Sequence, residues 1–241
     1  MIMRPDNRTP GEMRPVHITT DFLKTAEGSA LIEIGNTHVL CAATVEQGVP
    51  QFLRGSGRGW VTAEYSMLPR STVTRTPREV TKGRPSGRTH EIQRLIGRSM
   101  RSVVDLAALG ERSIILDCDV LQADGGTRTA SITGAFVAMG LAFQRLLECG
   151  AIKSLPVRDC VAAISAGIVG GELLVDLCYE EDSRAEVDMN VVMTGSGRLV
   201  EVQATAEQTP FDDVQMQRLV DMTRGSIAKL IEIQRGILGL P

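Results

Sequence analysis

Aromatic residues are scarce in this chain. It has one Trp, two Tyr and five Phe among 241 residues, although 43% of its residues are hydrophobic. Since this apolar fraction is ordinary for a globular protein, the core must be built from Val, Ile, Leu, Met and Ala. The composition therefore predicts a folded aliphatic core and excludes a disordered chain.

Cysteine and histidine lack any pairing pattern. The five cysteines are dispersed without a C-x-x-C pair, and the three histidines show no ligand spacing. An odd, scattered set of cysteines in apolar surroundings predicts buried, reduced thiols. A disulfide framework and a cysteine or histidine metal site are therefore disfavoured.

Long apolar runs are also missing. No uninterrupted stretch reaches the roughly 18 apolar residues of a membrane-spanning helix. The first 14 residues carry three arginines and two acidic residues, and they lack the apolar centre of a secretory signal. These absences predict a cytoplasmic protein with no membrane segment.

The net charge of −3 is distributed unevenly. Between Arg54 and His90 the sequence has eight basic residues and two acidic ones, so this segment carries +6 and the rest of the chain −9. Seven of the eight basic residues are Arg, whose planar group pairs with phosphate oxygens. A basic segment on an acidic body is typical of nucleic-acid binding. Because the segment is also rich in Pro, Ser and Thr, a solvated loop fits its composition equally well.

The order of apolar patterns predicts a mixed α+β fold in a single domain of residues 1–241. Strands are expected at 30–35, 38–45, 60–67, 113–121, 160–169, 172–178, 186–193 and 199–205. Helices are expected at 89–109, at 132–149 and from Thr209-Pro210 onward, with Pro210 at the first helical position. The arginines at 94, 98 and 101 lie off the apolar face of the first helix, where Glu91 and Asp105 are spaced to pair with them.

The segment 124–131, Asp-Gly-Gly-Thr-Arg-Thr-Ala-Ser, connects an expected strand to the apolar helix. Two consecutive glycines can direct backbone amides at one point, and the helix start adds unpaired amides. Thr127 contributes a hydroxyl and Arg128 a charged fork, while Arg88 is a candidate second cation at another helix start. The pattern fits an anion site, although a tight strand-to-helix connection explains the glycines as well.

An acidic segment, 180–188, joins two expected strands. Mg²⁺ prefers one or two carboxylates, with water and substrate phosphate completing its coordination. Asp188 lies at the start of a strand, where a carboxylate is held on rigid backbone. A metal site is one interpretation, and an acidic surface loop is the other.

Six segments, in order, resemble the ribonuclease PH family. They are Arg-Pro-Asp-Asn-Arg at 4–8, Arg-Ser-Thr-Val-Thr-Arg-Thr-Pro-Arg-Glu at 70–79, Gly-Arg-Thr-His-Glu-Ile-Gln-Arg-Leu-Ile-Gly-Arg at 87–98, Asp-Gly-Gly-Thr-Arg-Thr-Ala-Ser at 124–131, Glu-Asp-Ser-Arg-Ala-Glu-Val-Asp-Met-Asn at 181–190 and Ala-Glu-Gln-Thr-Pro-Phe at 206–211. The resemblance covers essentially the whole chain. One departure is Asn7, where Gly is common in the family.

The resemblance implies a fold of the ribosomal protein S5 domain 2-like type. It also implies a homo-hexameric ring, a trimer of dimers, with active sites near the subunit contacts. The implied reaction is phosphorolytic 3′→5′ removal of nucleotides after the CCA end of tRNA precursors, and from other RNA 3′ ends. Inorganic phosphate is the co-substrate, and nucleoside diphosphates are released.

The same resemblance assigns roles to residues. Phosphate binding falls to Arg88, Gly126, Thr127 and Arg128; catalysis to Arg128, Asp182 and Asp188; Mg²⁺ binding to Asp182 and Asp188; and tRNA binding to Arg70, Arg75 and Arg78. Asp188 is also a candidate general acid.

Two other functions remain to be weighed. A non-catalytic, RNA-binding ring subunit of an exosome-like assembly has no need of Arg128, Asp182 and Asp188, so their presence favours an enzyme. A Mg²⁺-dependent hydrolase is distinguished by its products, since it releases monophosphates without phosphate.

Overall fold

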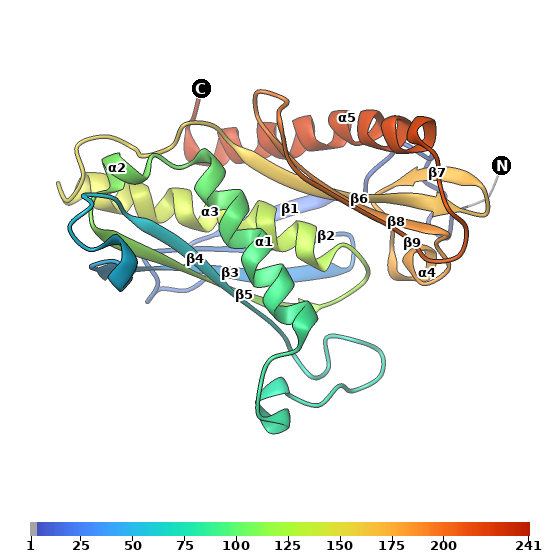
Figure 1. Ribbon diagram of the computed structural model, residues 1–241, viewed down its shortest axis with the longest axis horizontal. Coiled ribbons are helices and arrows are strands. Elements are labelled where there is room, and N and C mark those ends of the chain that lie inside the picture. The colour runs from blue at the N-terminus through green and yellow to red at the C-terminus, as the bar shows by residue number, and fades with distance from the viewer. Residues whose placement is uncertain (1–3) are drawn as a thin grey trace.

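Two β-sheets form the frame of the molecule (Figure 1). The computed structural model describes residues 4–241. The first sheet has the strand order β1-β2-β3-β5-β4, and the second has the order β7-β6-β8-β9. The strands are β1 Val16–Thr20, β2 Gly28–Ile34, β3 Thr37–Gln47, β4 Trp60–Met67, β5 Arg112–Gln122, β6 Val161–Val169, β7 Glu172–Val175, β8 Val187–Thr194 and β9 Leu199–Ala206. Neighbouring strands are antiparallel except β4 and β5, which are parallel.

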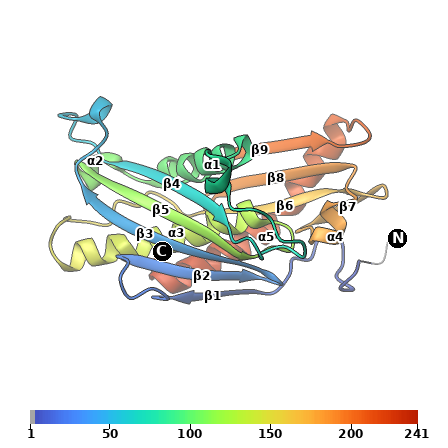
Figure 2. The same ribbon diagram turned by 90° about the horizontal axis from the view of Figure 1, so that it is seen from below.

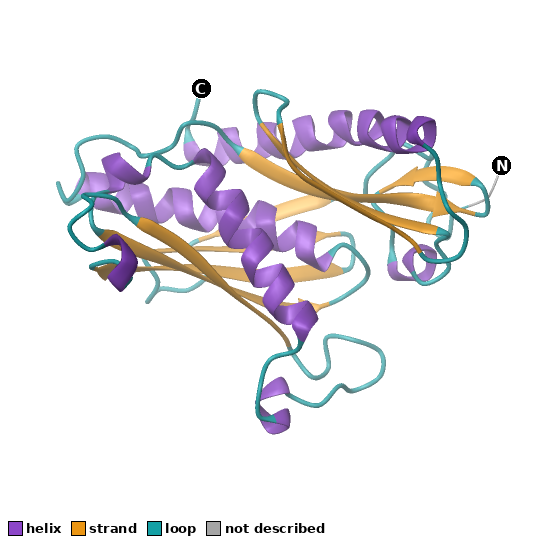
Figure 3. Ribbon diagram, viewed as in Figure 1, coloured by secondary structure: helices purple, strands orange, loops and turns teal. Residues whose placement is uncertain are grey.

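The helices pack on and between these sheets (Figure 3). They are α1 Gly87–Val103, α2 Leu106–Leu109, α3 Thr127–Glu148, α4 Tyr179–Asp182 and α5 Asp213–Leu238, with 3₁₀ turns η1 Gln51–Leu53 and η2 Glu79–Lys82. α3 contacts β2, β3 and β5 of the first sheet and β6 of the second. Figure 2 shows α1 between β4 and β9, and it contacts both. One continuous cluster of buried, mostly aliphatic side chains therefore spans both sheets, and the predicted α+β fold is confirmed.

The central helix α3 confirms the apolar helix expected at 132–149, although it begins earlier, at Thr127. An 18-residue window of Thr127–Glu148 has a mean hydropathy of 1.4, so the helix is long and apolar enough to cross a membrane by composition alone. Scattered Thr, Ser and Gly residues interrupt the apolar run and hide this property from a simple count. Since 78% of the window is buried inside the protein, α3 is the core helix that its apolar surface requires.

The helix expected over 89–109 is broken in two. α1 ends at Val103, and Val104 has extended backbone. Asp105 then caps α2, because its carboxylate accepts hydrogen bonds from two backbone amides of that helix. The apolar spacing continued through this cap, which is why a single helix was predicted.

The arginines of α1 also have other partners than expected. Arg98 forms an ion pair with Glu201 of β9. Arg101 donates to the carbonyl oxygen of Val61 at 2.7 Å and lies over the ring of Trp60, 4.4 Å from its centroid. The ion pair that the spacing predicts between Arg101 and Asp105 is therefore wrong, since Asp105 pairs with Arg158. Arg98 and Arg101 instead join α1 to its two neighbouring strands.

Two further corrections concern the C-terminal helix and one cysteine. α5 begins at Asp213, and Pro210 lies before it. Asp212 is the N-cap, and its carboxylate accepts from the amide of Gln215 at 2.8 Å in a capping box.

All five cysteines are free, as expected, but Cys149 is exposed whereas the others are buried.

Candidate active site

The site is built where α3 begins and packs against the α4 segment. Gly125 and Gly126 connect β5 to α3 with φ angles of +75° and +66°, a region that favours glycine. Gly125 packs against the backbone of Leu177 and Tyr179, so this connection touches the segment that leads into α4. Gly126 is the N-cap of α3, and the amides of the first helical turn have no partner within the helix. The start of α3 is therefore suited to binding an anion.

Arg14, which sequence analysis did not single out, fixes the orientation of this turn. Its guanidinium donates to the carbonyl oxygens of Asp124 and Gly125, the latter at 3.4 Å. The hydroxyl of Thr37 donates to the same Gly125 oxygen at 2.6 Å. Because the C=O and N–H of a trans peptide point in opposite directions, these contacts turn the next amides away from Arg14.

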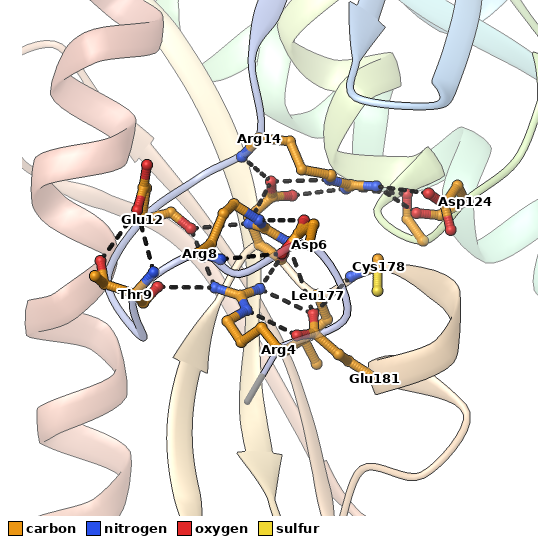
Figure 4. A network of polar contacts seen from close by, with 12 residues as sticks. Arg4, Asp6, Arg8, Thr9, Glu12, Arg14, Asp124, Leu177, Cys178 and Glu181 are labelled. Atoms are coloured by element: carbon orange, nitrogen blue, oxygen red, sulfur yellow. Dashed lines mark hydrogen bonds and ion pairs between the residues drawn. The ribbon is translucent and has the colours of Figure 1, made fainter. Parts of the chain in front are cut away.

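A buried ionic network ties the N-terminal segment to the second sheet (Figure 4). Arg4 pairs with Glu181 of α4 at 2.7 Å, and both side chains are at most 2% exposed. Arg14 pairs with Asp176 at 2.7 Å, and Arg8 also contacts this carboxylate. Buried charges of this kind are tolerated only when paired and hydrogen-bonded, so the network has a defined geometry. It holds α4, the helix that ends with Asp182, against the N-terminal segment.

Asp182 and Asp188 come together from α4 and β8. Burial raises the pKa of the Asp182 carboxyl, although the charges of Arg88 and Arg128 act to lower it. Burial and then the charge of Asp182 raise the pKa of Asp188, against the same two arginines. A further carboxylate, Glu207, raises both pKa values. Asp188 is half-buried and Asp182 lies exposed beside it, so the two carboxylates repel each other at a place that faces positive charge.

The cations come from the starts of two helices. Arg88 is the second residue of α1, and Arg128 is the second residue of α3. Both arginines lower the pKa of Tyr65, although its burial raises that pKa overall. The phenol oxygen of Tyr65 lies 2.9 Å from the hydroxyl oxygen of Thr127. Tyr65 therefore belongs to this site, although only its place near the end of a strand could have indicated it.

A cavity of about 620 Å³ adjoins these residues. Tyr65 and Arg88 line it together with Arg78, Arg84 and Asp117. Of the three arginines predicted to bind tRNA, Arg78 reaches this cavity. Arg70 and Arg75 are exposed on the segment between β4 and α1 and lie outside the cavity lining.

The predicted site residues thus form two groups. Arg88, Gly126, Thr127, Arg128, Asp182 and Asp188 gather at one place, whereas Arg70, Arg75 and Arg78 lie on the exposed segment beside it. Within residues 4–241, no three Asp, Glu, His or Cys side chains gather as a complete set of metal ligands. Two carboxylates still suit Mg²⁺, which usually keeps water and substrate oxygens in its coordination shell.

Comparison with known proteins gives matches over nearly the whole chain. Residues 12–143 match domain 1 of the 3′ exoribonuclease family, and residues 159–226 match domain 2. Ribonuclease PH of Solibacter usitatus is 70% identical over 98% of this chain and 99% of its own length. Ribonuclease PH of Moorella thermoacetica is 59% identical over 99% of this chain and 95% of its own length.

Solved structures share the fold at lower identity. A chain of the Archaeoglobus fulgidus exosome with RNA bound to the active site has a TM-score of 0.79 at 26% identity, covering 95% of this chain and 92% of that one. Rice Rrp46 has a TM-score of 0.79 at 17% identity, covering 98% of this chain and all of that one. This second likeness shows the fold alone.

The opposed cationic and acidic groups suit an enzyme that acts on an anionic phosphate ester. The family matches then specify which one: the chain belongs to the ribonuclease PH family of 3′ exoribonucleases. It is a phosphorolytic 3′→5′ exoribonuclease, as predicted, and this function is favoured over the non-catalytic ring subunit.

Proposed function

We propose that this enzyme trims tRNA precursors after their CCA end, as a homo-hexamer in the cytoplasm, with inorganic phosphate bound at the start of α3. The observation that carries the proposal is the meeting of Arg88 and Arg128 with Asp182 and Asp188. Positive charge from two helix starts faces a pair of carboxylates, which is the arrangement that a reaction between two anions requires.

Phosphate is an anionic nucleophile that must approach an anionic phosphodiester. Positive charge placed in advance offsets their repulsion and costs no reorganisation during the reaction. Arg88 and Arg128 offer forked donors, and the first turn of α3 adds unpaired amides. Arg14 orients the peptides that precede this turn, which carry the amides of Gly125 and Gly126. Together these groups would hold phosphate in line with the terminal linkage.

Asp182 and Asp188 are the residues that would hold Mg²⁺. Burial raises the pKa of both carboxyls, and the charges of Asp182 on Asp188 and of Glu207 on both add to it. A bound cation relieves this unfavourable negative charge. The metal would supply positive charge near the phosphate oxygens. Asp188 is also the candidate acid for the leaving 3′-oxygen, through the carboxyl oxygen that would not hold the metal.

Three exposed arginines support a tRNA substrate. Arg70 and Arg75 lie on the segment 68–86 outside the cavity, and Arg78 on the same segment lines it. Such a place suits contacts with the phosphate backbone of a folded RNA whose 3′ tail enters the site. The similar A. fulgidus chain belongs to an exosome with RNA bound to its active site, which supports RNA binding and a ring assembly.

The substrate is tested with a tRNA that carries extra 3′ nucleotides. We expect phosphate-dependent shortening that stops at the CCA end, seen by sequencing the RNA 3′ ends. Trimming that continues into the acceptor stem, or equal rates on unstructured RNA, would contradict a tRNA-specific role. Sedimentation analysis of the same preparation tests the assembly, and a monomer at assay concentration would contradict the hexamer.

A further inference from the structure

Arg128 is held by a residue of the second sheet. Its Nη1 donates to Oε1 of Gln203 at 2.7 Å. Gln203 lies on β9, whereas Arg128 lies in the first turn of α3. The contact joins residues 75 positions apart in the sequence, so it fixes the side chain of Arg128 against a separate element.

A second hydrogen bond sets the direction of the Gln203 amide. Its Nε2 donates to Oε1 of Glu91 on α1. A carboxylate can only accept, so Glu91 requires the NH₂ group on its own side and the amide oxygen on the side of Arg128. With the amide reversed, the NH₂ group would face the guanidinium and two donors would meet. Glu91 thus determines that Gln203 accepts from Arg128.

Glu91 also lies one turn after Arg88 on α1. The chain of contacts from Arg128 through Gln203 to Glu91 therefore connects the two helix starts that carry the cations. We propose that Gln203 and Glu91 are positioning residues for phosphate, because they hold Arg128 and the start of α1 in a fixed relation. This inference rests on the phosphate role proposed above for Arg128.

The neutral side chain at position 203 is suited to this task. An amide oxygen takes one of the five donors of Arg128 and leaves its charge and its other donors to phosphate. A carboxylate at the same place would form an ion pair with the guanidinium, compete with phosphate and repel Glu91. Glutamine therefore positions the arginine without neutralising it.

The strand β9 offers a matched control. Glu201 lies two residues before Gln203, so the two side chains lie on the same face of β9. Glu201 pairs with Arg98 of α1, so it also joins β9 to that helix. Glu201→Ala removes a link between the same two elements without touching Arg128.

The experiment measures the KM for phosphate and kcat on an RNA oligomer for Gln203→Leu, Gln203→Glu, Glu91→Ala and Glu201→Ala. We expect Gln203→Leu to raise the phosphate KM about 10- to 150-fold, the range of one hydrogen bond to a charged group, with kcat at saturating phosphate nearly unchanged. Gln203→Glu should raise the phosphate KM further and Glu91→Ala should raise it less. Glu201→Ala should leave the phosphate KM unchanged. Glu91→Gln keeps an acceptor for Nε2 and loses less phosphate affinity than Glu91→Ala.

A binding measurement without RNA separates positioning from general damage. Phosphate stabilises the folded protein by mass action, so the phosphate-induced rise in Tm is expected to be smaller in Gln203→Leu than in Glu201→Ala. An unchanged phosphate KM and Tm response in Gln203→Leu would overturn the inference, as would equal losses in Gln203→Leu and Glu201→Ala. Arg128→Ala is the reference: normal phosphate affinity in that variant would instead refute the phosphate role of Arg128 itself.

Discussion

Gly125 lies so close to Leu177 that a Cβ atom at residue 125 would stand 2.3 Å from the Leu177 carbonyl oxygen. Gly125 belongs to the turn that starts α3, and Leu177 lies just before α4. The close approach of these two backbones brings the proposed phosphate site and the acidic pair together. Glycine at position 125 is therefore required by contact as well as by its positive φ.

Gly125→Ala is expected to destabilise the fold more than a glycine replacement that involves backbone conformation alone. Gly171 is the matched control, because its φ of +77° resembles the +75° of Gly125 but a Cβ there would meet no atom within 4 Å. A left-handed alanine costs about 1–2 kcal/mol, so we expect that loss for Gly171→Ala and roughly twice as much for Gly125→Ala. Urea denaturation measures both. Equal losses would show that the contact with Leu177 is unimportant.

Arg128→Ala and Arg88→Ala are each expected to lower phosphate-dependent activity severely. Loss of one preorganised charged donor costs on the order of 10²- to 10³-fold in rate. RNA binding, measured by fluorescence anisotropy without phosphate, should stay close to that of the unmodified protein. Normal turnover of either variant at sub-saturating phosphate would remove it from the phosphate site.

Asp188→Asn is expected to separate activity from stability. A neutral amide holds Mg²⁺ poorly, so activity should be nearly lost. The folded pKa of Asp188 is raised by burial and by Asp182. Between the ordinary pKa of the unfolded chain and the raised pKa of the folded one, the unfolded chain has released this proton while the folded chain still holds it. The free energy of unfolding therefore falls as pH rises through this range, and above it the ionised carboxyl of the wild type destabilises the fold. In metal-free buffer, Asp188→Asn should therefore have a higher Tm than the wild type at pH 8.

The Tm advantage of Asp188→Asn should shrink as pH falls and vanish below the ordinary pKa of an aspartate, where the wild-type carboxyl is protonated in both states. Thermal unfolding from pH 3 to pH 8 with a chelator present follows this change. A Tm below that of the wild type at pH 8 would contradict the unfavourable charge at Asp188.

Replacement of Arg70, Arg75 and Arg78 together by Ala is expected to raise the KM for tRNA and to flatten its salt dependence. Counterion release gives a slope of roughly 0.7–0.9 log units for each lost phosphate contact. A short single-stranded oligomer should lose much less, because it reaches Arg78 at the cavity but not Arg70 and Arg75. Equal losses on both substrates would instead place the segment in support of the active site or of the assembly.

The site residues that sequence analysis found all lie in local motifs. Arg88 and Arg128 follow helix-start signals, and Asp188 begins a strand, so neighbouring residues indicate their setting. Arg14 and Gln203 carry no such signal. Their partners lie 162 and 75 residues away, and only the packing of the two sheets brings them together.

The elements show the same division between local and long-range information. The strand at 60–67 has the predicted bounds because its pattern and its ends are local. The break at Asp105 was missed because apolar spacing outweighed a capping residue, which is itself a local signal. The partners of Arg98 and Arg101 could not be predicted. These partners, Glu201 and Val61, lie on strands that pack against α1 only in the folded chain.

The most direct test of the account is the identity of the released nucleotides. Wild-type enzyme and Arg128→Ala are incubated with a 3′-extended tRNA, with and without phosphate, and the products are separated by chromatography. The account predicts nucleoside diphosphates from the wild type only when phosphate is present, and a much lower yield from Arg128→Ala that recovers partly at high phosphate. Nucleoside monophosphates released in phosphate-free buffer, or full diphosphate yield from Arg128→Ala at low phosphate, would contradict it.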